Sequence, residues 1–261
     1  MTGKLTVGAD GRVTGPAQIV HNDPFPCVNG RYGSGQMMGV LMHTTVSEAP
    51  SAVSWFNNPQ AQASAHFVIA ESGEITQMGP IGKGWEAWHA AEANATWYGI
   101  EHADNGNPAN PLTPAQITAS AQLVECLSAF AGFPLQISDS PSVKGYGWHG
   151  MGGEAFGGHF ACPGDVRKAQ RPQIVALAMS IRSGGTVPAS PAPPREWLTA
   201  GMSSLASLAQ QQHTDPATIL HLTAAHGAWP ADVAAYVNGV FAGTISPKAA
   251  MPRGLALYLP G

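Results

Sequence analysis

The first part of the chain alternates short apolar runs with turn residues, a pattern that predicts strands rather than helices. Residues 1–36 carry repeated Asp-Gly, Asn-Gly and Asp-Pro turn pairs, so we expect only short strands and loops there. Residues 39–43 form an apolar run that predicts a short buried strand. Residues 66–70 and 74–78 predict two strands that a Ser-Gly turn joins into a hairpin. Residues 97–103 predict a further short strand, which carries a carboxylate.

Helical spacing of the apolar residues is found at three places. Residues 51–56, directly after Pro50, predict a short helix. The clearest helix lies between Thr113 and Gly132, because the threonine can cap its first turn, a proline follows, and the glycine ends it. Residues 166–182 predict another helix, interrupted near an Arg-Pro pair, whose apolar stripe should pack on the sheet.

A stretch rich in glycine and proline divides the chain. Residues 183–194, SGGTVPASPAPP, have no apolar face and the composition of a semi-extended linker. We therefore expect one domain at residues 1–182 and a small module at residues 195–261. The expected elements of the module are strands at 197–199 and 255–259, helices at 203–212 and 216–223, and a helix or irregular insert at 231–241.

Composition and charge restrict the class of partner. The chain has 261 residues, and 44% of them are hydrophobic, enough to bury a sizeable core. Only 11% are charged and the formal net charge is -4, which argues against recruitment to nucleic acid by a basic surface. The cysteines Cys27, Cys126 and Cys162 are an odd number in unrelated contexts, so they do not predict a disulfide framework. A chain without a predicted disulfide framework suits synthesis in a reducing cytoplasm.

The glycine-rich stretch Gly145–Asp165 carries most of the candidate chemistry. It contains His149, His159 and Cys162, and its glycine content argues against both helix and strand. Histidine and cysteine are ligands that zinc prefers, and a catalytic zinc usually takes three protein ligands and keeps a fourth position open. Because this stretch supplies two or three ligands at most, a further histidine is required, and His43 at the edge of a buried strand fits best. In the alternative interpretation, the cysteine is a small buried hydrophobe and His149 a hydrogen-bonded loop residue.

Glu101 is a candidate general base. Strand alternation places it on the face opposite Ile100. On a solvated edge this position carries no function, whereas on the side of a cleft the carboxylate can take a proton from a water molecule. Its distance from the metal site therefore decides between the two interpretations.

Six segments between residues 17 and 182 occur in a recognisable order and spacing: VLMHTT, SAHFVIAESGEITQM, AWHAA, WYGIEHAD, GWHGMGG and ACPGD. Together they resemble the zinc-dependent N-acetylmuramoyl-L-alanine amidases of the amidase-2 and peptidoglycan recognition protein type. This resemblance implies an α/β fold in which a mixed central β-sheet is flanked by helices.

The end of the chain shows a second resemblance. SLASLAQQQHTDPATILHLT and the closing MPRGLALYLPG are similar to a LysM-like cell-wall-binding module of α+β type, although residues 224–249 are longer than that module normally carries. The N-terminus has no apolar h-region, and no apolar run approaches the length of a membrane span. An amidase followed by such a module, without a signal peptide, resembles a bacteriophage endolysin that lyses actinobacterial hosts. Such a protein is made in the host cytoplasm and acts on the wall after release.

The family resemblance implies roles for individual residues. It places the three zinc ligands on His43, His149 and Cys162, and the catalytic glutamate of one branch of the family on Glu101. The tyrosine that some phage amidases place before the His-Phe strand is Ala65 here, so the glutamate branch is the better match.

The sequence departs from the family pattern near the third ligand. A lysine usually lies two residues before that ligand, but Phe160 occupies this position and cannot hold a developing oxyanion. We expect His159 to replace the lysine as the oxyanion donor. Because the separation of His149 from Cys162 is longer than usual, His159 as a ligand in place of His149 is an alternative.

The resemblance implies a peptidoglycan hydrolase that cleaves the amide between N-acetylmuramic acid and the L-alanine of the stem peptide, with Zn²⁺ as cofactor. Trp55, Trp88 and His89 are expected to line a groove for glycan or peptide, unless they are plain core residues. We expect bacterial peptidoglycan as the partner, no nucleic-acid or membrane partner, and a monomer.

Three other functions compete with this one. A metal-free receptor would bind peptidoglycan without cutting it, but Cys162 together with both histidines favours the enzyme. A structural zinc site normally has four protein ligands with paired cysteine spacing, which the sequence lacks. A glycosidase needs two carboxylates, and acidic residues are few around the glycine-rich stretch.

Overall fold

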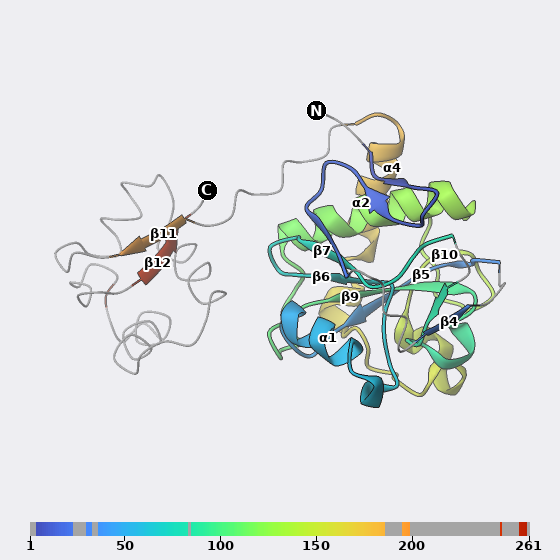
Figure 1. Ribbon diagram of the computed structural model, residues 1–261. Helices are drawn as coiled ribbons and strands as arrows, with labels where there is room; N and C mark the ends of the chain where they lie inside the picture. The colour runs from blue at the N-terminus through green and yellow to red at the C-terminus, as the bar shows by residue number, and fades with distance from the viewer. Residues whose placement is uncertain are drawn as a thin grey trace. The chain divides into compact units, whose positions relative to one another are not determined.

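The computed structural model describes residues 4–22, 30–32, 36–82, 85–185, 195–198, 246 and 256–259. The chain divides into two units, Met1–Ser190 and Pro191–Gly261, and the linker expected at residues 183–194 spans the division between them (Figure 1). Every predicted site residue lies in the first unit.

A six-stranded sheet forms the centre of the first unit, with the strand order β10-β5-β9-β6-β7-β3. The strands are β3 (Ile19–His21), β5 (Gly39–Thr44), β6 (Phe67–Ile69), β7 (Ile75–Gln77), β9 (Trp97–His102) and β10 (Gly145–Trp148). The pairs β10–β5, β5–β9 and β9–β6 are parallel, β6 and β7 form the predicted antiparallel hairpin, and β7 is parallel to β3. The expected α/β fold with a mixed central sheet is confirmed.

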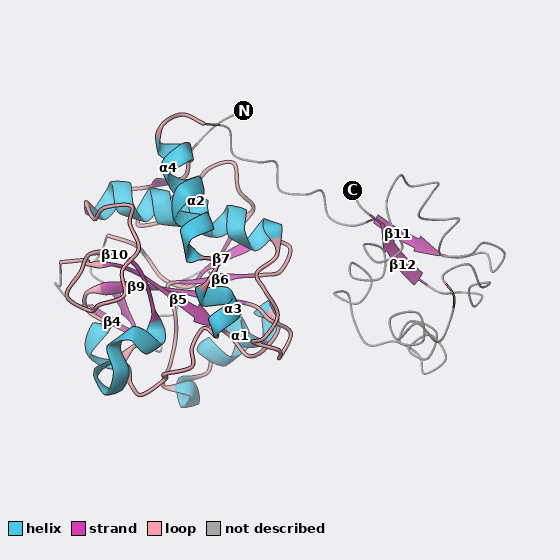
Figure 2. Ribbon diagram, turned by 180° about the vertical axis from the view of Figure 1, so that it is seen from behind, coloured by secondary structure: helices cyan, strands magenta, loops and turns pink. Residues whose placement is uncertain are grey.

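Helices cover both faces of this sheet (Figures 1 and 2). Helices α2 (Pro114–Ala131) and α4 (Arg171–Arg182) lie on one face, and α1 (Ala49–Phe56) packs on the other. The larger apolar core lies under α2 and α4 and includes Val40 and Met42 of β5. Burial of these apolar side chains is the dominant favourable contribution to folding.

Helix α2 begins and ends at residues that its sequence predicts. The hydroxyl of Thr113 accepts the backbone N–H of Gln116, and the side chain of Gln116 accepts the backbone N–H of Thr113, so the two residues form a capping box. Gly132 follows in the left-handed region, with φ of 76°, where glycine avoids the strain of a side chain. The predicted helix is confirmed together with its termination signals.

The remaining helices are short. The helix predicted at residues 166–182 is interrupted as expected: α3 (Asp165–Lys168) ends before α4 begins, and Pro172 occupies the first turn of α4. Two single-turn 3₁₀ helices, η1 (Pro59–Ala61) and η2 (Ala91–Ala93), lie in the connections. Across the described ranges, no helix has the length and apolar character needed to cross a membrane.

The prediction that Gly145–Asp165 is neither helix nor strand is wrong. Its first four residues are strand β10, and His149–Phe156 form the 3₁₀ helix η3, which is kinked at Gly153. Two tertiary effects outweigh the low strand propensity of glycine. β10 pairs in parallel with the whole segment Gly39–Met42 of β5, and Tyr146 is buried in the main core at 1% exposed.

Outside the central sheet, the described strands form antiparallel pairs. The pairs are β1 (Thr6–Val7) with β2 (Val13–Thr14), β4 (Gly30–Tyr32) with β8 (Trp85–Ala87), and β11 (Arg195–Leu198) with β12 (Ala256–Leu259). The last pair belongs to the second unit and agrees with the strands predicted near its two ends. The helices predicted at residues 203–212, 216–223 and 231–241 lie outside the described residues.

Candidate metal centre and active site

The ends of three parallel strands bring a row of polar side chains together. His43 on β5 is the register partner of Glu101 on β9. On the other side of β5, the pairing with β10 ends at Met42, the residue before His43. His149 directly follows β10 and so comes next to His43, with ring centroids 4.3 Å apart. Side chains alternate between the faces of a strand, and Met42 points into the core under α2. The row therefore lies on the opposite face, the one that carries α1.

Cys162 reaches this row from the loop that follows η3. Its carbonyl accepts the N–H of Gly150 at 3.0 Å, and its own N–H donates to the carbonyl of His159 at 3.1 Å. A Cβ on Gly150 would come within 2.4 Å of a carbonyl oxygen of this loop, so the close approach of the two segments requires glycine. As a result, the ligand atoms of His43, His149 and Cys162 all lie within 4.8 Å of one another.

His149 has a ring nitrogen with a free lone pair, and both histidines of this group are neutral. Nε2 of His149 lies 2.8 Å from the carbonyl oxygen of Phe156, which can only accept, so Nε2 carries the proton and Nδ1 is bare. Burial lowers the pKa of His149 to about 4 and the pKa of His43 well below its usual value. Both rings are therefore neutral near pH 7, which is the form of imidazole that binds a divalent metal ion.

The thiol of Cys162 ionises only with help from a positive charge. Its pKa is raised to about 12, mainly by burial and next by the charge of Glu101, while the N–H of Thr44 and the charge of Arg167 oppose the shift. A divalent ion would supply the positive charge, because metal binding displaces the thiol proton. Two neutral imidazoles and one thiol are donors that zinc accepts, so the residues present fit a zinc ion.

Glu101 is the last member of this row, and one of its carboxyl oxygens has no hydrogen-bond partner. The residue is 9% exposed; its Oε1 lies 3.8 Å from Nδ1 of His43, and its Oε2 is buried without a hydrogen-bond partner. Burial is the main cause that raises the pKa of Glu101 to about 8; the charge of Asp104 adds to it and the charge of Arg167 opposes it. With this pKa the group is mostly protonated near pH 7. A divalent cation bound by the neighbouring donor group would lower the pKa, and the open Oε2 of the carboxylate could then receive a proton from a water molecule.

Three residues that the sequence did not single out support this row. The hydroxyl of Thr44 donates to Oδ2 of Asp104 at 2.6 Å and accepts from Nη1 of Arg167 at 3.1 Å. Arg167 is fully buried, and its guanidinium also donates to two carbonyl oxygens at the end of β9. This network ties the ends of β5 and β9 to α3. Thr44 and Asp104 lie within the segments VLMHTT and WYGIEHAD, but the segments alone did not reveal their role, because it depends on which strand ends meet.

His159 lies beside the donor group without belonging to it. The residue is exposed, and its ring centroid is 4.9 Å from that of His149. The atoms that converge with those of His43 and Cys162 belong to His149. The geometry therefore favours His149 over His159 as the second loop ligand.

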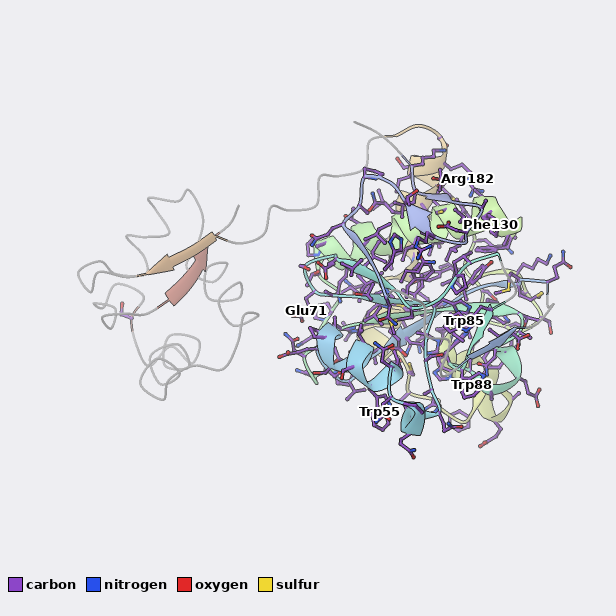
Figure 3. The ribbon with its side chains drawn as sticks, in the orientation of Figure 1. Trp55, Glu71, Trp85, Trp88, Phe130 and Arg182 are labelled. Carbon is purple, nitrogen blue, oxygen red and sulfur yellow. The ribbon has the colours of Figure 1, made fainter. Side chains whose placement is uncertain are left out.

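The three residues predicted to line a groove are placed differently from one another. Trp55 on α1 is 53% exposed and Trp88 is half-buried, and Figure 3 labels both on the side of the sheet that carries α1. His89 is only 9% exposed, with one ring nitrogen 3.0 Å from Nε2 of His43 and the other 2.9 Å from the carbonyl oxygen of Trp97. His89 is therefore a buried neighbour of a candidate ligand, and this burial favours the alternative of a core residue over a place in the groove.

Comparison with known proteins identifies the family. Residues 33–165, about half of the chain, match the family model described as N-acetylmuramoyl-L-alanine amidase. The chain belongs to this amidase family. The matched region contains the converging donor group and the neighbouring carboxylate, namely His43, Glu101, His149 and Cys162.

Individual relatives agree with this assignment. N-acetylmuramoyl-L-alanine amidase A of Achromobacter lyticus is 38% identical over 140 residues, which are 48% of this chain and 77% of that protein. Among solved structures, the Staphylococcus aureus hydrolase AmiA in complex with its ligand is similar with a TM-score of 0.51 at 16% identity, over 67% of this chain and 88% of that chain. At this identity the second likeness shows a shared fold alone.

Proposed function

We propose that the chain is a zinc-dependent N-acetylmuramoyl-L-alanine amidase that degrades the bacterial cell wall. The bond it cuts is the amide between the lactyl group of N-acetylmuramic acid and the L-alanine of the stem peptide. The observation that carries the proposal is the convergence of His43, His149 and Cys162 within 4.8 Å, with Glu101 next in the same row. Membership of the amidase family supports the same reaction.

Digestion of purified peptidoglycan tests this function. The protein is expected to release stem peptides that begin with a free L-alanine amine, while the glycan strands stay intact. Mass spectrometry of the soluble products identifies the new ends, and metal analysis of the same sample should find stoichiometric zinc. New reducing sugar ends would indicate a glycosidase. Binding of peptidoglycan without release of peptides would indicate a receptor.

The donor group has the composition of a catalytic zinc site. Among the described residues it has three members, two histidines and one cysteine. Three protein ligands with an open fourth position are typical of catalytic zinc, whereas structural sites normally have four. Zinc held there would polarise the amide carbonyl and lower the pKa of a water molecule to about 7.

Glu101 is the proposed acid and base of the reaction. Its carboxylate accepts a proton from the attacking water as the water oxygen adds to the amide carbon. It then gives this proton to the nitrogen of L-alanine as the carbon–nitrogen bond breaks, and the carboxylate returns to its starting state. The buried oxygen without a partner and the position beside His43 support this role.

His159 is the proposed donor to the oxyanion that forms when water adds to the amide. It lies beside His149 and is exposed, so substrate can reach it. The neighbouring Phe160 is 59% exposed and has no polar group that could take this role.

The variant His159→Ala is expected to keep its zinc and to turn over roughly 10²–10³-fold more slowly, as the loss of one oxyanion donor does. His159→Gln, which retains an N–H donor, should recover part of the rate. Zinc content and the rate of stem-peptide release are measured on both variants. Loss of zinc in His159→Ala would instead make His159 a ligand, and an unchanged rate would leave it without a role in catalysis.

We also propose that residues 195–261 anchor the protein to the cell wall and are joined by the linker at 183–194 to a catalytic domain at 1–182. The LysM-like sequence supports this role, and the described part of the second unit has β11 paired with β12. The proposed biological setting is lysis by an actinobacteriophage endolysin. The protein would be made in the host cytoplasm and would act on the wall after release, as a monomer without a nucleic-acid or membrane partner.

A fragment of residues 195–261 is expected to sediment with purified sacculi, because the module should bind the wall without the catalytic domain. The matched control is the fragment 1–182, which should sediment less than the full chain. If the module fragment stays in the supernatant while the full chain sediments, the module is not the anchor.

A further inference from the structure

His89 connects a candidate zinc ligand to the backbone of the central sheet. Its Nδ1 lies 3.0 Å from Nε2 of His43, and its Nε2 lies 2.9 Å from the carbonyl oxygen of Trp97 on β9. The two imidazole rings meet edge to face, with an interplanar angle of 78°. Both distances are those of hydrogen bonds, so the carbonyl and the two rings form one continuous hydrogen-bonded chain.

The carbonyl at the end of this chain determines where each proton lies. A carbonyl oxygen only accepts, so Nε2 of His89 carries a proton. A neutral His89 then has a bare Nδ1, which accepts the proton on Nε2 of His43. The exposed fractions of the two residues are 9% and 2%, so a further proton would place a charge where water cannot solvate it. Nδ1 of His43 is therefore the nitrogen with the free lone pair.

The free nitrogen is the one that faces the rest of the site. Nδ1 of His43 lies 3.8 Å from Oε1 of Glu101. His149 reaches the same state by another route, because its Nε2 donates to a backbone carbonyl and its Nδ1 stays bare. A histidine that carried its proton on Nδ1 would present an N–H where a cation needs a lone pair.

The position of the His89 ring is closely restricted. The backbone N–H of His89 donates to Oδ1 of Asn94 at 2.9 Å, which holds the segment after β8. A Cβ on Gly99 of β9 would lie 2.6 Å from Cγ of His89, so the glycine makes room for the ring against the strand. The ring therefore keeps its contact with His43.

We propose that His89 is a positioning residue of the metal site, which holds the proton of His43 on Nε2 and so reserves Nδ1 for a divalent cation. This role rests on the proposed function, because the cation is the proposed zinc. His89 acts through His43 and does not touch the substrate. Removing such a partner of a metal-bound histidine typically weakens metal binding by about 10–100-fold.

Two nearly isosteric variants test this role. His89→Asn retains an acceptor close to the position of Nδ1, whereas His89→Leu has a similar shape and no acceptor. Zinc affinity is measured by competition with a chelator, and thermal unfolding shows that each variant is folded. We expect His89→Leu to bind zinc about 10–100-fold more weakly than the wild type and His89→Asn to stay close to the wild type. Equal affinity in all three proteins, or an equal loss in both variants, would overturn the proposal.

The proton position in the metal-free protein provides a readout that does not depend on zinc. Nitrogen-15 NMR of the histidine rings should find the proton of His43 on Nε2 in the wild type and shared between both nitrogens in His89→Leu. A wild-type proton on Nδ1, or the same tautomer in both proteins, would overturn the proposal. Wild-type protein that neither binds zinc nor releases stem peptides would contradict the proposed function separately.

Discussion

Replacement of Cys162 by alanine is expected to abolish zinc binding and amide hydrolysis together. The thiol is one of the three converging donors and the one that becomes negative when a metal ion displaces its proton. In Cys162→Ala the two neutral imidazoles remain, and no anionic ligand offsets the charge of the ion. Zinc content after dialysis and the release of stem peptides from peptidoglycan are measured on the same sample, and both should fall to background.

Cys126→Ala is the matched control for this experiment. Cys126 is also a free cysteine, but it is buried in the main core, where it packs from α2. Its loss should lower thermal stability modestly and leave zinc content and the rate unchanged. His43→Ala should behave like Cys162→Ala, because it removes another of the converging donors. Stoichiometric zinc in an inactive Cys162→Ala protein would exclude the cysteine from the ligand set.

Replacement of Glu101 by glutamine is expected to retain zinc and to lower turnover by roughly 10²–10⁴-fold, the usual contribution of a general acid and base. Glutamine fills the same buried space but cannot accept a proton. The folded protein should not lose stability, because burial disfavours the charged carboxylate, as its pKa of about 8 indicates. Zinc content, turnover and thermal unfolding are measured in parallel.

Glu125→Gln is a suitable control for this variant. Glu125 is also a buried glutamate, at 3% exposed, but it lies on α2 and pairs with Arg182. Its substitution should leave turnover and zinc content unchanged. If Glu101→Gln lost its zinc, the carboxylate would act on the metal site itself. If Glu101→Gln turned over at the wild-type rate, another group would be the base.

Local pattern was sufficient to predict most elements of the first unit. The hairpin at residues 66–78, the helix between Thr113 and Gly132 and the apolar strand ending near His43 all depend on signals within a few neighbouring residues. A turn, a capping threonine and a terminal glycine act on the backbone next to them. For the same reason, alternation placed Glu101 on the face opposite Ile100 before any strand neighbours were known.

The arrangement of the site was decided by the tertiary structure. The sequence determined which residue types are available: histidines, a cysteine and a carboxylate beside predicted strands. Only the pairing of β10, β5 and β9 placed His149, His43 and Glu101 in one row, and that pairing also made a strand of a glycine-rich segment. Strand order and register depend on contacts between residues far apart in the chain, which no local pattern specifies. For the same reason, the sequence could not predict the contact of His89 with His43. The hydrogen bond between them exists only because β5 and the segment after β8 meet in the folded protein.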